Sequence, residues 1–222
     1  MSRKNALELD FSMLTAEWPD VALETLSRLD TPWKIQIFLD ETPYSTEPIY
    51  RSPLSVLRDR RAHCFDGALF AAAALRRLEQ PPLILDMRAH NDDDHVIAIF
   101  RIDGHWGAIA KSNTTVLRYR EPVYRTLREL VMSYFDFYYN LNGEKALREF
   151  SGAVDLRKFD QLGWMSEDAG LERIALHLDA VKHAQILTPA MIARLSPVDK
   201  KLFDAGLLGA DADGLYKPGD AC

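Results

Sequence analysis

The sequence has few cysteines, and this scarcity limits the chemistry it can carry. Only two of its 222 residues are cysteines, Cys64 and Cys222, and they lie far apart along the chain. Such a pair has neither the ligand spacing of a zinc site nor the even, closely spaced pattern of a disulfide framework. We therefore expect no metal, no other cofactor and no disulfide scaffold.

Long apolar segments and an excess of positive charge are also missing. No run approaches the roughly 20 apolar residues that cross a bilayer, and no secretory apolar region follows the N-terminus. Lysine and arginine total 27 against 33 acidic residues, a net charge of −6, whereas contacts to phosphates need clustered basic residues. We expect a soluble, cytoplasmic protein with no membrane and no nucleic-acid partner, and we interpret the short cluster Arg58–Arg61 as a solvated helix end.

A helix followed by strands dominates the first half of the chain. The small and apolar run 65–75 predicts a helix from Cys64 to about Leu78, which Pro81 and Pro82 stop. Strands are predicted over 83–87, 95–102 and 105–111, and Asp103-Gly104 is a strong signal for a two-residue hairpin turn. The pattern predicts an α+β fold in which the helix packs on an antiparallel sheet.

The hairpin sets a register between its two strands. If Ile102 faces His105, Arg101 faces Trp106, and the same count continued to the strand end places His95 opposite Ser112. His95 is a candidate catalytic base, and a base of this kind needs a neighbour that orients its ring. Ser112 or the adjacent Asn113 would lie where such a residue is needed.

The second half of the chain has helical periodicity. Helices are predicted over 126–140, 144–150, 166–183, 188–195 and 197–205. We therefore divide the chain into a catalytic core with its N-terminal helices (1–122), a helical region packed on that core (123–205) and a flexible tail (206–222).

Cys64 is the candidate nucleophile, because a thiol in the first turn of a helix faces unpaired backbone N–H groups that favour the thiolate. The arginines of 58–61 could lower its pKa further. His95 enters on a different element and is the candidate base, as nucleophilic cysteine sites require. The triplet Asp92–Asp94 before it lacks the spaced ligands of a calcium loop, so we interpret it as a solvated turn.

The order of these residues resembles the transglutaminase-like superfamily, which shares its core with papain-like cysteine proteases. The resemblance lies in Ser55–Ala68 (SVLRDRRAHCFDGA), in His95 at the start of a strand and in Trp106 on the next strand. It covers about residues 30–115 and implies a papain-like core with Cys64 as nucleophile and His95 as base. Trp106 is then either a wall of the substrate site or a packing residue of the hairpin.

The sequence departs from the family pattern at the third catalytic position. The family usually has an aspartate about four positions after the strand tryptophan, and here that position is Ala110. Ser112 and Asn113 are the substitutes that the hairpin register suggests.

These residues predict a cysteine-dependent amide hydrolase or acyl transferase that acts on a peptide or protein substrate. One alternative is an inactive protein of the same fold that binds a partner through residues 123–205. A weaker one is an acyltransferase that uses a thioester donor. The sequence leaves the substrate, the direction of transfer and the oligomeric state open.

Overall fold

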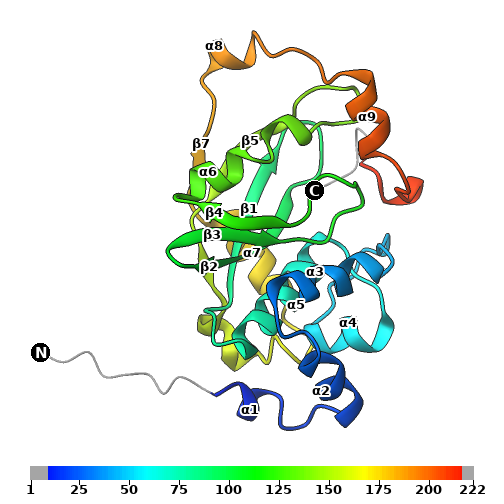
Figure 1. Cartoon of the computed structure of the whole chain (residues 1–222), viewed down its shortest axis with the longest axis vertical. Coiled ribbons are helices and arrows are strands. Elements are labelled where there is room, and N and C mark those ends of the chain that lie inside the picture. The colour runs from blue at the N-terminus through cyan, green and yellow to red at the C-terminus, as the bar shows by residue number, and fades with distance from the viewer. Residues whose placement is uncertain (1–9, 217–222) are drawn as a thin grey trace, which may run out of the picture.

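One antiparallel sheet runs through the molecule and carries helices on its faces (Figure 1). The computed structural model describes residues 10–216, so Cys222 lies outside the described residues. The strands of the sheet are ordered β4-β3-β2-β1-β5-β7, and β6 pairs with the first two residues of β1, Leu83 and Ile84. The elements are α1 (Phe11–Leu14), α2 (Asp20–Ser27), α3 (Pro32–Glu41), α4 (Pro53–Asp59), α5 (Cys64–Arg77), β1 (Leu83–Ala89), β2 (His95–Ile102), β3 (His105–Ile109), β4 (Arg120–Tyr124), α6 (Leu127–Met132), η1 (Phe135–Phe137), β5 (Leu147–Ser151), β6 (Val154–Asp155), η2 (Leu156–Leu162), α7 (Glu172–Ala180), β7 (His183–Gln185), α8 (Pro189–Ile192), α9 (Lys200–Gly206) and η3 (Ala212–Gly214). The architecture is α+β, as the sequence predicts.

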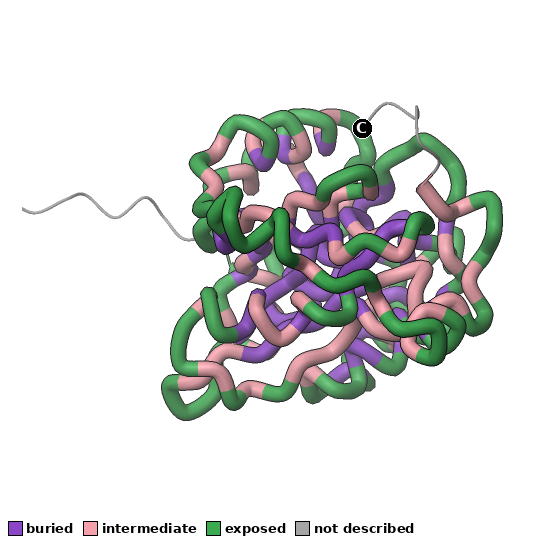
Figure 2. Tube along the Cα trace, turned by 90° about the horizontal axis from the view of Figure 1, so that it is seen from above, coloured by how far each residue is buried: buried purple, intermediate pink, exposed green. Residues whose placement is uncertain are grey.

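The two faces of the sheet bury separate apolar clusters. Along β2, Val96 and Ala98 contact the cluster formed with α2, α3, α5 and α7, whereas Ile97 and Ile99 join the cluster formed with α6 and Tyr134. This alternation follows from the two-residue period of a strand. Both faces are covered, so the central strands are buried in the middle of the molecule (Figure 2).

Helix α5 lies at the centre of the apolar cluster formed with α2, α3 and α7. Its residues from Phe65 to Arg76 are all buried, which small side chains allow because they let neighbouring elements approach closely. A Cβ atom at Gly67 would lie 2.3 Å from the Cβ of Lys111, so this helix turn touches the chain just after β3. The Lys111 ammonium group in turn donates to the carbonyl of Leu39 in α3 at 2.9 Å and to that of Thr42.

The hairpin confirms the predicted register and shows where it ends. Ile102 pairs with His105 and Arg101 with Trp106, while Asp103 and Gly104 have φ of 46° and 81°, as the turn requires. Strand pairing stops at Ala98 and Ile109.

Beyond Ile109 the chain is bound to α3 instead of β2. The side-chain amide of Gln36 donates to the carbonyl of Ala110 at 2.9 Å and accepts its N–H at 3.1 Å. The expected pairing of His95 with Ser112 is therefore wrong.

Residues 123–205 are not the helical region that the sequence predicts. The segment expected as a helix over 144–150 instead forms β5, which pairs with β1, and β7 extends the same sheet beyond β5. The helix expected over 126–140 is limited to α6 and η1, and that expected over 166–183 to α7. Tertiary pairing with β1 has overridden a weak local preference.

The segment after residue 206 is part of the fold as far as residue 216. Asn113 exchanges two hydrogen bonds with the backbone of Asp211, at 2.8 and 2.9 Å, and Thr115 bonds to the carbonyls of Ala205 and Gly206. The predicted flexible tail is thus wrong for 206–216, and 217–222 lie outside the described residues. Between residues 10 and 216 no helix has the length and apolar character needed to cross a membrane.

The close approach of α5 to Lys111 predicts that a methyl group added at Gly67 destabilises the fold. Gly67→Ala should lower the free energy of unfolding by about 2 kcal/mol, because steric overlap outweighs the better helix propensity of alanine. Urea denaturation measures this. Gly152→Ala is the matched control, since no atom lies within 4 Å of the added Cβ, and it should change stability by less than about 0.5 kcal/mol. Equal effects of the two changes would contradict the close contact.

Candidate active site

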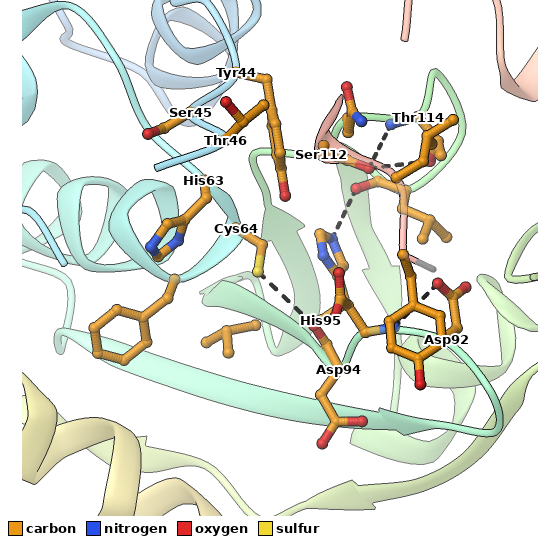
Figure 3. A pocket seen from close by; sticks show the side chains of 18 of the residues that line it. Tyr44, Ser45, Thr46, His63, Cys64, Asp92, Asp94, His95, Ser112 and Thr114 are labelled. Carbon is orange, nitrogen blue, oxygen red and sulfur yellow. Dashed lines mark hydrogen bonds between the residues drawn. The ribbon is translucent and has the colours of Figure 1, made fainter. Parts of the chain in front are cut away.

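A cavity of about 440 Å³ opens where the start of α5 meets the start of β2. Both predicted catalytic residues, Cys64 and His95, line it, together with the loop before α4, the segment after β3 and residues 213–216 (Figure 3). The fold thus brings the sulfur and the imidazole into one cavity from two different elements.

Cys64 is the first residue of α5, as the sequence predicts. His63 caps the helix: its side chain accepts the Asp66 N–H, and the Asp66 carboxylate accepts the His63 N–H at 3.2 Å. The Cys64 thiol donates to the carbonyl of Asp94 at 3.8 Å. The backbone N–H of Cys64 belongs to the first helical turn, where no intrahelical acceptor exists.

The surroundings of Cys64 favour the neutral thiol, whereas the sequence analysis favours a thiolate. Burial raises its pKa to about 12, the backbone of Val96 opposes this in part, and the acidic residues Asp93, Asp66 and Asp86 raise it further. The arginines of 58–61 do not reverse this effect: Arg58 pairs with Asp59, and Arg60 lies over the Phe38 ring at 4.3 Å.

His95 is buried, with 5% of its surface exposed, and its orientation is fixed by a backbone group. Its Nε2 lies 3.0 Å from the carbonyl oxygen of Leu117. A carbonyl can only accept, so Nε2 carries the proton and Nδ1 is left as the lone-pair nitrogen. Burial lowers the pKa of His95 to about 4, and the ring is therefore neutral at pH 7.

The predicted orienting side chains make no hydrogen bond to His95 among residues 10–216. Ser112 bonds to Thr114, and Asn113 bonds to the backbone of Asp211. Ala110 is buried and its backbone is bound to Gln36. The Leu117 carbonyl takes the place of a third side chain, and no sequence signal could have identified it because every residue carries a carbonyl.

Trp106 does not lie at this site. It is not among the residues that line the cavity, and the guanidinium group of Arg101 lies over its ring at 5.3 Å. Its side chain packs against the apolar cluster on the α6 side of the sheet, which agrees with a packing residue of the hairpin and not with the predicted substrate-binding role.

Two cavity-lining features escaped the sequence analysis. Tyr44 belongs to a turn-rich loop expected to cross the surface, yet it forms a bridge to Ala62 and its hydroxyl points into the cavity between Cys64 and His95 (Figure 3). The turn Asp92–Asp94 also lines the cavity, and burial followed by its acidic neighbours raises the pKa of Asp92 to about 7. Among residues 10–216, no three His, Cys, Asp or Glu side chains converge as metal ligands do.

The protonation state of Cys64 predicts a characteristic reactivity. A folded-state pKa above that of free cysteine means less thiolate at every pH below it. Alkylation by iodoacetamide should be slower than in the urea-unfolded chain at pH 7–8, and should rise about tenfold per pH unit up to pH 10. Peptide mapping separates Cys64 from Cys222. A rate that is already constant below pH 8 would show that the thiolate is the resting form.

Comparisons with known proteins find only distant similarity. No protein-family model matches the sequence, and no curated protein matches it. Among solved structures, Legionella pneumophila LapG is similar, with 15% identity and a TM-score of 0.32 over 48% of this chain and 67% of LapG. The calcium-bound form of LapG has 16% sequence identity and a TM-score of 0.32, with 66% of that chain covered. The EGTA-treated form has 16% sequence identity and a TM-score of 0.31, with 64% of that chain covered. The chain thus spans about two thirds of the length of these structures, and this similarity does not assign it to a family.

Proposed function

We propose that the protein is a cysteine-dependent amide hydrolase or acyl transferase of transglutaminase-like type, acting on a peptide-like substrate through Cys64 and His95. One observation carries the proposal. The Leu117 carbonyl fixes His95 as the Nε2–H tautomer, so the basic Nδ1 belongs to a ring in the same cavity as the candidate nucleophile.

The proposed reaction begins from a neutral thiol and a neutral imidazole. Nδ1 of His95 takes the thiol proton as the Cys64 sulfur forms a bond to the substrate carbonyl carbon, because a resting ion pair is disfavoured by the opposite pKa shifts of the two groups. The imidazolium then protonates the leaving amine, the C–N bond breaks and an acyl-enzyme remains. Water or a second amine attacks this thioester, transfers a proton to Nδ1 and releases the sulfur, which regains its proton.

We propose two donors that stabilise the oxyanion of the tetrahedral intermediate. One is the unpaired backbone N–H of Cys64 in the first turn of α5. The other is the Tyr44 hydroxyl, which makes no hydrogen bond to any of residues 10–216 and whose pKa burial raises, so that it stays a donor at neutral pH.

The second candidate function is a binding protein without catalysis. The protonated, hydrogen-bonded thiol and the absence of a third catalytic side chain at Ala110 favour it. In this case the cavity would bind a peptide that it does not cleave.

A hydroxylamine trap distinguishes the two functions. Full-length protein is incubated with a synthetic peptide library and hydroxylamine, which converts an acyl-enzyme into a peptide hydroxamate whether the natural acceptor is water or an amine. We expect hydroxamates detected by mass spectrometry, complete loss in Cys64→Ala, and a loss of about 10²–10⁴-fold in His95→Ala. Cys222→Ser is the matched control and should keep full activity. Product formation by Cys64→Ala would reject the proposal, and a folded protein that forms no product would establish the binding function.

The Tyr44 role gives a separate prediction. Removing one oxyanion donor costs about 10²-fold in kcat, so Tyr44→Phe should lower kcat by that factor while KM changes little. Ser112→Ala is the control: its hydroxyl also lines the cavity but bonds to Thr114, and we expect a change below about twofold. A loss in Ser112→Ala as large as that in Tyr44→Phe would contradict this assignment.

A further inference from the structure

The cavity that holds Cys64 and His95 has a strongly one-sided charge. Seven acidic residues line it, and no lysine or arginine of residues 10–216 does. The chain as a whole has a net charge of only −6. The negative potential is therefore concentrated at this site, where low-dielectric walls strengthen it.

Part of this negative charge is compensated within the fold. Glu47 forms an ion pair with Arg51, Asp86 lies 2.8 Å from the His183 Nε2, and Asp94 lies 3.9 Å from Arg88. Asp92, Asp179 and Asp213 have no ion-pair partner among residues 10–216 and come from three separate segments around the cavity.

His95 supplies an independent sign that the cavity is built for a ligand. The side chain is 95% buried, its Nε2 is occupied by Leu117, and its Nδ1 has no hydrogen-bond partner among residues 10–216. The ring lies on the cavity wall beside the Cys64 sulfur (Figure 3). Nδ1 is therefore a free acceptor that can take a hydrogen bond from a molecule bound in the cavity.

The form of the acidic lining points to an extended cation and not to a metal ion. No three His, Cys, Asp or Glu side chains between residues 10 and 216 converge closely enough to hold a metal. Aromatic residues, among them Tyr44, Tyr50 and Phe137, line the same cavity as the carboxylates. A cavity that offers both carboxylates and aromatic rings can bind ammonium and guanidinium groups, through charge and through cation–π contact.

We propose that this cavity selects a peptide segment with lysine or arginine side chains, whose positive charges lie against Asp92, Asp179 and Asp213. The inference rests on the proposed function and names its substrate class.

Binding of such a segment also has a consequence for the nucleophile. A cation bound in the same cavity favours the charged form of the Cys64 thiol and so opposes the effect of Asp93, Asp66 and Asp86, and the thiol would become easier to ionise when substrate is present. Burial raises the Asp92 pKa to about 7, and a neighbouring cation favours its charged form, so the binding should strengthen as the pH rises through 7.

Three small alkylating reagents of different charge test the inference without requiring turnover. In full-length Cys222→Ser protein, the rate of Cys64 modification is measured by mass spectrometry with 2-bromoethylamine (cationic), iodoacetamide (neutral) and iodoacetate (anionic). Each rate is divided by that of N-acetylcysteine at the same pH. We expect the normalised rate to be highest for the cationic reagent, lower for the neutral one and lowest for the anionic one, with about thirtyfold between the extremes at low salt. This spread should be smaller at 0.5 M NaCl because surface charges are then screened.

Matched variants locate the effect. Asp92→Asn combined with Asp179→Asn should reduce the spread to within about threefold. Glu17→Gln combined with Glu121→Gln changes the net charge equally at exposed positions outside the cavity and should preserve the spread. The same spread in both double variants would overturn the assignment.

Protection experiments identify the cation. Tetralysine should slow iodoacetamide labelling of Cys64 at concentrations where tetraglutamate, spermidine and CaCl₂ do not. Protection by spermidine or CaCl₂ without protection by tetralysine overturns the peptide assignment. Hydroxamate formation without any charge order would reject this inference alone, and a charge order in a protein that forms no hydroxamate would reject the proposed function alone.

Discussion

The position of Cys64 depends on the buried carboxylate of Asp66. This group is inaccessible to solvent and accepts the backbone N–H of Arg51 at 2.8 Å as well as that of His63. It thereby ties the loop before α4 to the first turn of α5, and the Arg51 side chain extends the link to Ser45 at 2.9 Å. Burial raises the Asp66 pKa to about 7 while these hydrogen bonds oppose the shift. This link acts together with the bridge between Tyr44 and Ala62 to hold the wall of the cavity that carries Tyr44 against the start of α5.

The pKa values of the groups in the cavity depend on how deeply the fold buries them. Burial favours the neutral forms of both the Cys64 thiol and the His95 ring, and the acidic lining raises the thiol pKa further. The helix N-terminus alone would favour the thiolate, but its effect is worth only about 1 kcal/mol at most sites, whereas burial of a charge costs more.

Local sequence signals predicted the centre of the fold well. The run of small residues in α5 ends at two prolines, β2 has a clear apolar character, and Asp103-Gly104 permits only one tight turn, so each element is determined by its own residues. Prediction failed for β5, because its five residues are stabilised by pairing with β1 and β7. It failed again at residues 206–216, which are held by Asn113 and Thr115 from a distant part of the chain.

The sequence by itself determined that Cys64 begins a helix and that His95 begins a strand, since capping, periodicity and turn signals are encoded within a few residues. Only the tertiary structure decided which group orients His95, because a backbone carbonyl such as that of Leu117 leaves no mark in the sequence. Only the tertiary structure, likewise, decided that the thiol lies in a cavity lined by carboxylates, which raise its pKa. Burial and the sum of charges around a cavity arise from segments that meet in space and not along the chain.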